Sequence, residues 1–288
     1  MSITDLTLDE QDIHFVLKDW LKISRLSQFE CYKDYDEETI EMLVEEGIRF
    51  SKDIVAPSRT ESDRVGCVME NGRVKSPECM KEPFRKGFEL GWAALNASSK
   101  YGGQAAPASI GLAVNEGINA GNPGLSAFFA LTVGAARLIE SFGTGDLKEK
   151  YIKKMNQGKY NGTMCLSEPQ AGSDVGAGIT SAEVLRDGSY RIKGTKSWIS
   201  NGDTDLAENT IHAVLARIKG APKGTAGLSL FLVPHTLVEE DGSLGEWNDV
   251  TVASIEKKMG LHSSPTAMLK FGENDHCQGW LLGEKNRG

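Results

Sequence analysis

The sequence has 288 residues, of which 40% are hydrophobic and 25% charged. These proportions exclude a disordered or collagen-like chain and are typical of one large or two average globular domains. The net charge of −8 argues against a phosphate-backbone binder, which needs a concentrated basic face, so we expect no nucleic-acid partner.

Cysteine and histidine usage argues against disulfides and metals. The five cysteines are odd in number and contain no C-x-x-C pair, which predicts reduced thiols rather than a disulfide framework or a zinc ribbon. The five histidines lack metal-site spacing, so we expect no metal. The chain opens with no basic segment followed by an apolar one, so we expect no secretory signal and a cytoplasmic protein.

The uncharged run 117–136 has the length of a membrane span. It contains Asn119, Asn122 and Pro123, which are costly in lipid. We therefore interpret the run as a buried helical hairpin and expect no membrane span.

Apolar residues recur at helical spacing throughout the first half of the chain. We expect Asp9 and Asp36 to cap the first two helices, and Pro57 to end the second. Ser76-Pro77 reads as the start of a third helix and Pro123 as the start of another. The last helix is expected after the break at 143–145. The predicted helical segments are 9–21, 36–56, 77–88, 123–142 and 147–155.

Near Asn161 the hydrophobic period changes from 3.6 to 2, which we interpret as a domain boundary: an all-helical domain over residues 1–160 and a β-domain over residues 161–288. Asp187-Gly188 and Asn201-Gly202 are turn signals, and 234–250 reads as a long loop. Some seven short strands predict a barrel or sandwich, hence an α+β chain. The predicted strands are 182–185, 190–193, 197–200, 211–218, 228–233, 250–255 and 267–271.

The segment 164–176 is the best candidate for chemistry. Its small residues Ala171, Gly172 and Gly176 let the backbone approach a ligand closely, and consecutive turn amides can bind an anion or a polar ring edge. The residues alone leave two interpretations open, a ligand loop and a plain glycine turn into the β-domain. Phosphate-loop, serine-hydrolase and dinucleotide-fold signatures are absent from the sequence.

Two strings resemble signatures of the acyl-CoA dehydrogenase family. The run Cys165-Leu166-Ser167-Glu168-Pro169-Gln170-Ala171-Gly172-Ser173-Asp174 resembles the string that opens that family's middle β-domain. The run Lys193-Gly194-Thr195-Lys196-Ser197-Trp198-Ile199-Ser200-Asn201-Gly202 resembles its second element. The segments 66–74 and 234–250 are similar to those of the larger, methylthiopropionyl-CoA dehydrogenase-like members. The resemblance implies an N-terminal helical domain, a middle β-domain and an FAD cofactor.

The resemblance also implies particular cofactor contacts. It places Leu166 and Ser167 at the pyrimidine end of the flavin ring, Trp198 against the ring, and the Ser200 hydroxyl near N5. An indole offers a wide apolar contact, and a hydroxyl can either donate or accept a hydrogen bond. Met164 stands where many relatives have an aromatic residue, and its thioether can fill the same space.

The same resemblance assigns the neighbouring loop. Gly172 and Ser173 are expected to line the flavin pyrophosphate and the acyl-CoA channel, so that Ser173 also binds substrate. Glu168 is expected to structure the loop and not to act as a base.

The family's catalytic glutamate lies in a C-terminal four-helix domain, which we expect to be absent from these 288 residues; we therefore expect no catalytic residue within them. Three readings stay open: one half of a split FAD-dependent acyl-CoA dehydrogenase with a partner chain, a non-catalytic acyl-CoA- or flavin-binding protein, or a truncated fragment. The first implies an acyl-CoA substrate, an electron-transfer flavoprotein partner and a hetero- or homo-oligomer. It leaves dehydrogenase or oxidase chemistry and the acyl group open.

Overall fold

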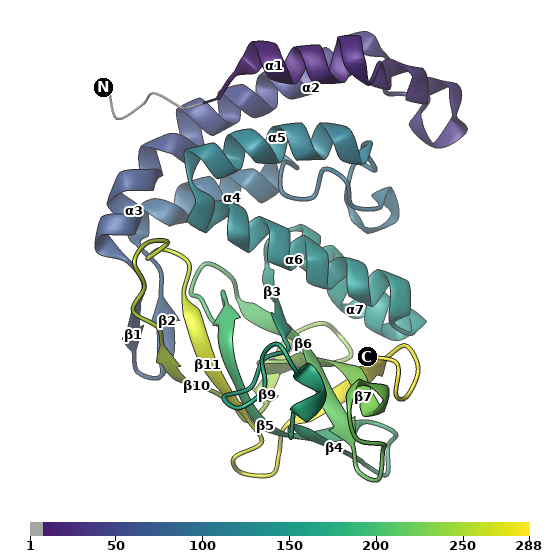
Figure 1. The fold of residues 1–288 in the computed structure, drawn as a ribbon, viewed down its shortest axis with the longest axis vertical. Coiled ribbons are helices and arrows are strands. Elements are labelled where there is room, and N and C mark those ends of the chain that lie inside the picture. The colour runs from purple at the N-terminus through teal and green to yellow at the C-terminus, as the bar shows by residue number, and fades with distance from the viewer. Residues whose placement is uncertain (1–7) are drawn as a thin grey trace.

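A computed structural model describes residues 8–288 of the chain (Figure 1). Apart from one short hairpin at 68–75, helices form the first part and strands the second, which confirms the α+β architecture expected from the sequence. The α-helices are α1 (Glu10–His14), α2 (Glu37–Phe50), α3 (Arg59–Val65), α4 (Lys81–Glu89), α5 (Ala108–Gly121), α6 (Pro123–Phe142) and α7 (Gly145–Asn156). The strands are β1 (Val68–Glu70), β2 (Arg73–Lys75), β3 (Tyr160–Cys165), β4 (Ser181–Val184), β5 (Tyr190–Ser200), β6 (Asn209–Ile218), β7 (Leu228–Pro234), β8 (Thr236–Val238), β9 (Leu244–Trp247), β10 (Val250–Ile255), β11 (Thr266–Phe271) and β12 (Gln278–Leu282).

Three of the expected helix starts are confirmed by their capping bonds. The Asp9 carboxylate accepts from the Asp12 amide at 3.1 Å, and Asp36 accepts from Thr39 at 2.8 Å. Asn122 caps α6 and Pro123 takes its first position, where the missing N–H costs nothing.

Two expectations about prolines are wrong. Pro57 does not end the second helix: α2 ends at Phe50, and helical turns continue through Ser51–Val55 and Ala56–Ser58 into α3. Regular α geometry stops before the proline because the chain widens into a π-type turn there. The sequence Ser76-Pro77 precedes a 3-10 turn, Glu78–Met80, and α4 starts only at Lys81.

An eight-stranded sheet forms the β-domain, with the order β10-β11-β5-β12-β7-β6-β3 and with β4 paired to β5 and β6. Strand β5 is the longest and joins the two predicted strands at 190–193 and 197–200 into one. The sequence also missed β3, β12 and two small hairpins. The first is β1–β2, and the second, β8–β9, lies within the region predicted to be a loop.

Helix α6 lies between α5, α7 and the sheet (Figure 1). It is long and apolar enough to cross a membrane by length and composition, but 44% of its most apolar window is buried inside the protein. Its buried side chains belong to two apolar cores, one among the helices and one shared with the sheet. The expected buried helical hairpin is therefore present as α5 and α6. The switch from helix to strand falls between Asn156 and Tyr160; the domain division at residue 160 remains our proposal.

Candidate functional site

The two sequence motifs, some thirty residues apart, lie side by side. The Ser197 amide donates to the Ser167 carbonyl at 2.9 Å. The Lys196 ammonium donates to the Leu166 carbonyl, also at 2.9 Å. Strand β5 thus holds the loop that follows β3, and the two motifs form one surface.

Glu168 holds the first motif from inside. Its side chain is 2% exposed and accepts from the Thr180 and Ile179 amides at 3.0 and 2.7 Å. It also accepts from the Gln170 side chain at 2.8 Å and from the Lys196 ammonium at 3.0 Å. Every lone pair of the carboxylate therefore has a structural use, as expected for a residue that shapes the loop.

The electrostatics of this pair support the same role. Burial alone would raise the pKa of the Glu168 carboxyl, but the hydrogen bonds from Thr180 and Ile179 and the neighbouring Lys196 charge outweigh it and lower the pKa to about 2. A carboxylate with so low a pKa is a poor proton acceptor near neutrality. Glu168 is thus unsuited to act as a catalytic base.

Trp198 occupies a bulge in β5. Opposite β11, Lys196 pairs with Leu269 and Ile199 with Ala267, so β5 has one more residue than its partner over this stretch. Trp198 has a φ of 58°, a left-handed conformation that costs a bulky residue about 1–3 kcal/mol. The bulge turns the indole outward, where it is 55% exposed. Ser200, two residues on, is exposed as well.

The seven residues assigned to the flavin from the sequence differ in exposure. Leu166, Gly172, Ser173, Trp198 and Ser200 are exposed, and Met164 and Ser167 are half-buried. Met164 packs at the edge of the core shared by α6, α7 and the sheet. The structure therefore joins Leu166 and Ser167 to the strand of Trp198 and Ser200, whereas Gly172 and Ser173 lie farther along the loop with no direct bond to β5.

These features fit a flat, partly polar ligand. A wide indole and the Leu166 side chain offer apolar contact. Within residues 8–288, no hydrogen bond engages the Ser167 or Ser200 hydroxyl, and each can therefore donate to or accept from a ligand. No His, Cys, Asp and Glu cluster that could hold a metal occurs among the described residues.

Sequence reasoning missed two buried charges beside the site. Lys196 is 2% exposed, although lysine is almost never fully buried without a partner. Asp203, three residues after Ser200, is fully buried and pairs with Arg73. The burial of Lys196 could have been predicted from the sequence, because Lys196 occupies an inward position between Ile192 and Ile199 on a strand. No pattern in the sequence indicated the burial of Asp203.

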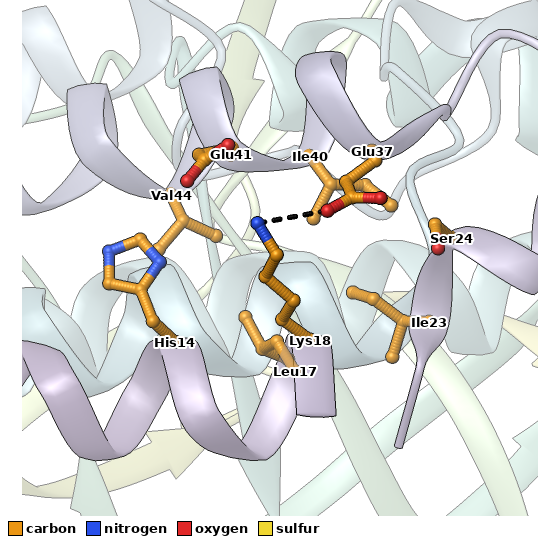
Figure 2. Close-up of a pocket in the computed structure, with 9 residues that line it drawn as sticks. All are labelled: His14, Leu17, Lys18, Ile23, Ser24, Glu37, Ile40, Glu41 and Val44. Carbon is orange, nitrogen blue, oxygen red and sulfur yellow. Dashed lines mark ion pairs between the residues drawn. The ribbon is translucent and has the colours of Figure 1, made fainter. Parts of the chain in front are cut away.

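Three pockets of the described structure lie away from the two motifs. One lies between α1 and α2, where Lys18 forms an ion pair with Glu37 at 2.9 Å (Figure 2). Two more flank α3 and the loop between β10 and β11, where His262 contacts Asp63. None of these three pockets is lined by a residue of the two motifs.

Two family models match this chain. Residues 37–159 match the family model of the acyl-CoA dehydrogenase N-terminal domain, and residues 163–273 match that of the middle domain. A butyryl-CoA dehydrogenase of Syntrophomonas wolfei is 38% identical over 95% of this chain and 46% of its own length. A 3-methylmercaptopropionyl-CoA dehydrogenase of Ruegeria pomeroyi is 36% identical over 96% of this chain and 47% of its own length.

A solved structure shares the fold. An acyl-CoA dehydrogenase of Bacillus anthracis, complexed with FAD, superposes with a TM-score of 0.68 at 23% identity, over 88% of this chain and 39% of its own. The chain spans about half the length of the curated relatives it matches. Both motifs, the two domain matches and the fold agree, and the chain belongs to the acyl-CoA dehydrogenase family, of which it carries the N-terminal and middle domains.

Proposed function

We propose that this chain forms the N-terminal and middle half of an FAD-dependent enzyme that converts an acyl-CoA thioester to the enoyl-CoA. One observation carries the proposal: the outward bulge at Trp198, two residues before Ser200, lies directly beside the Leu166–Ser167 turn. That juxtaposition brings an exposed indole and the exposed Ser200 hydroxyl close to the turn that carries the half-buried Ser167 hydroxyl.

The flavin, when bound, supplies the hydride acceptor for the β-hydrogen of the substrate. The residues of this chain bind the flavin and orient it. Trp198 contributes the apolar contact to the ring, and the Ser167 and Ser200 hydroxyls contribute hydrogen bonds. Met164 packs behind the turn, and Gly172 and Ser173 extend the surface toward the phosphates and the acyl-CoA.

Glu168, the buried carboxylate of the first motif, does not suit proton abstraction, because it is fully engaged and has a pKa of about 2. We therefore propose that the base comes from a C-terminal helical domain of the kind that the family carries. Such a domain can be supplied by a continuation of this polypeptide or by a second chain. Electron-transfer flavoprotein is the proposed acceptor of the electrons, and the cytoplasm the proposed location.

Flavin titration tests the proposal. We expect the purified chain to bind FAD, seen as a shift of the flavin absorbance bands, and Trp198→Ala to weaken that binding. Butyryl-CoA added without oxygen should leave the flavin oxidised, because the base is missing. Adding the C-terminal helical domain of the Syntrophomonas relative should allow butyryl-CoA to bleach the flavin absorbance.

The alternative function, a non-catalytic acyl-CoA- or flavin-binding protein, gives a different result. It retains FAD binding, but no helical domain restores bleaching. A chain that binds neither FAD nor butyryl-CoA, alone or with the helical domain, would overturn both readings.

A further inference from the structure

The β1–β2 hairpin and the residue after it contact the segment 203–205, which follows strand β5. These residues are more than 120 positions away from that segment in the sequence, yet three consecutive hydrogen-bonding positions connect them. The Val74 amide donates to the Asp203 carboxylate at 2.8 Å, the Ser76 amide donates to Asp205 at 2.8 Å, and the Ser76 and Thr204 hydroxyls lie 2.9 Å apart.

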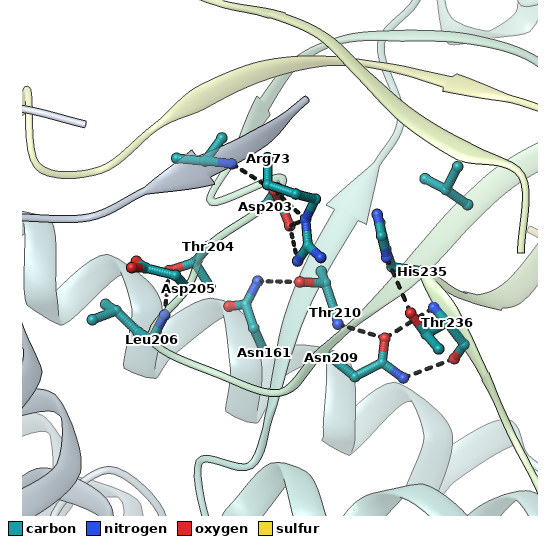
Figure 3. Close-up of polar contacts among 12 residues, drawn as sticks. Arg73, Asn161, Asp203, Thr204, Asp205, Leu206, Asn209, Thr210, His235 and Thr236 are labelled. Carbon is teal, nitrogen blue, oxygen red and sulfur yellow. Dashed lines mark hydrogen bonds and ion pairs between the residues drawn. The ribbon is translucent and has the colours of Figure 1, made fainter. Parts of the chain in front are cut away.

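Arg73 dominates this contact. Its guanidinium bonds Asp203 through two nitrogens, with Nε at 2.9 and 3.1 Å from the two carboxylate oxygens and Nη2 at 2.8 Å from Oδ1. Figure 3 shows the Arg73 side chain reaching to Asp203 in this way. The Asp203 side chain is 0% exposed and that of Arg73 is 45% exposed. Among the described residues, Arg73 is the one cation paired with this buried carboxylate. A fork-shaped pair fixes orientation as well as charge.

The segment that is fixed begins two residues after a strained stretch. Trp198 and Asn201 have φ values of 58° and 54°, so two non-glycine residues within four positions adopt a left-handed conformation. Such conformations persist only when the surroundings over-determine them. Asn201 is held by the Ser264 hydroxyl at 2.8 Å and by the Asn161 amide at 2.9 Å. The hairpin supplies the next support, at Asp203.

We propose that Arg73 is a positioning residue for the flavin site: the β1–β2 hairpin, through Asp203, holds the end of β5 so that Trp198 and Ser200 keep one orientation. This inference rests on the proposed role of these two residues toward FAD. Arg73 itself touches neither motif residue.

A readout that needs no flavin tests the proposal. The chain labelled with 5-fluorotryptophan has five fluorine resonances, one for each tryptophan, and Trp198→Phe identifies the resonance of Trp198. In Arg73→Gln we expect the Trp198 resonance to move or broaden, while those of Trp20 and Trp280 stay unchanged. Lys75→Gln, which removes a solvent-exposed pair with Glu70 in the same hairpin, should leave all five unchanged.

Arg73→Lys is a second, milder variant that keeps the proposal testable if Arg73→Gln fails to fold. It keeps the charge but loses the fork, so we expect a smaller displacement of the same resonance and an FAD dissociation constant raised about threefold, against about tenfold for Arg73→Gln. An unchanged Trp198 resonance in Arg73→Lys, with Arg73→Gln either unchanged or unfolded throughout, would overturn the proposal. A displaced Trp198 resonance in a chain that binds no FAD would support the positioning role of Arg73 and overturn only the proposed flavin function.

Discussion

The Lys196 ammonium lies 3.0 Å from the Glu168 carboxylate, and both side chains are 2% exposed. One member belongs to each motif, so this single buried pair joins the loop after β3 to the middle of β5. Burying two charges is costly, and the cost is offset only when further hydrogen bonds complete the pair. Here the Thr180 and Ile179 amides and the Leu166 carbonyl complete it.

Replacing Glu168 by glutamine should lower the free energy of unfolding by about 3–5 kcal/mol, because the Lys196 charge stays buried without a counter-charge. Urea denaturation measures the loss. The matched control is Glu183→Gln, which removes an exposed pair with Lys219 at 3.6 Å and should change the free energy by less than about 0.5 kcal/mol. Equal losses in the two variants would contradict a special role for the buried pair.

The same carboxyl predicts a dependence on pH. Its pKa is lowered from 4.5 to about 2 in the folded protein, so its contribution to stability is complete above pH 4.5 and is lost as the pH falls toward about 2. We expect the wild-type free energy of unfolding to decrease across this window, and the decrease to be smaller in Glu168→Gln. Parallel curves for the two proteins would show that another group titrates there.

Trp198→Gly should be more stable than Trp198→Ala by about 1 kcal/mol, because only glycine adopts a φ of 58° without steric cost. The indole is 55% exposed, so its removal costs little buried area. Both variants should bind FAD about tenfold more weakly. Thermal unfolding and flavin titration check the two statements separately, and an alanine variant that equals glycine in stability would argue against strain at this position.

The sequence predicted the helix caps and the turns because these depend on neighbours three or four residues away. Asp9 and Asp36 are examples, each bonding an amide three positions on. The motif strings assigned Trp198 and Ser200 to the flavin through the family resemblance, and the structure shows both residues exposed. Neither the alternation of polar and apolar residues nor any string signalled the Arg73–Asp203 pair, since its partners are 130 positions apart.

The hairpin β8–β9 was missed for a different reason. Its second strand, Leu244–Trp247, is mostly exposed, so no alternation of buried and exposed residues marks it. Strand β3 was missed because its residues are nearly all buried and include Asn161 and Thr163, polar side chains that bond residues far away in the sequence. Patterns that depend on one buried face fail in both situations.

Two buried histidines predict a second pH dependence, at higher pH. Burial, the largest cause in both cases, lowers the pKa of His212 from 6.5 to about 3 and that of His235 from 6.5 to about 4. Between about pH 6.5 and pH 4 the unfolded chain therefore binds protons that the folded chain does not, and stability falls as the pH falls. His235→Gln should flatten this slope.

Between about pH 4.5 and pH 7 Glu168 keeps its charge, but His262 also titrates, because its bond to the Lys258 carbonyl and the neighbouring Asp63 raise its pKa from 6.5. A raised pKa stabilises the folded protein at low pH, so His262 opposes the effect of the buried histidines. The difference between the thermal unfolding midpoints of the wild type and His235→Gln across this range therefore gives the contribution of His235. His276→Gln is the control, since His276 is exposed and its removal should leave the slope unchanged. If His235→Gln and the wild type lose stability in parallel, His235 does not carry the effect.

The space around Gly162 indicates that α6 packs closely against the sheet. A Cβ atom at this position of β3 would lie 2.8 Å from the Ala135 Cβ and 2.9 Å from the Thr132 Cα, which is backbone and cannot turn away. Gly162→Ala should therefore lower the free energy of unfolding by about 1–3 kcal/mol through overpacking. Gly134→Ala is the matched control on α6 itself: it is exposed with no atom within 4 Å, and helix propensity should make it more stable by up to about 1 kcal/mol. Denaturation of both variants measures the contrast, and a neutral Gly162→Ala would mean that α6 lies farther from β3 than the structure has it.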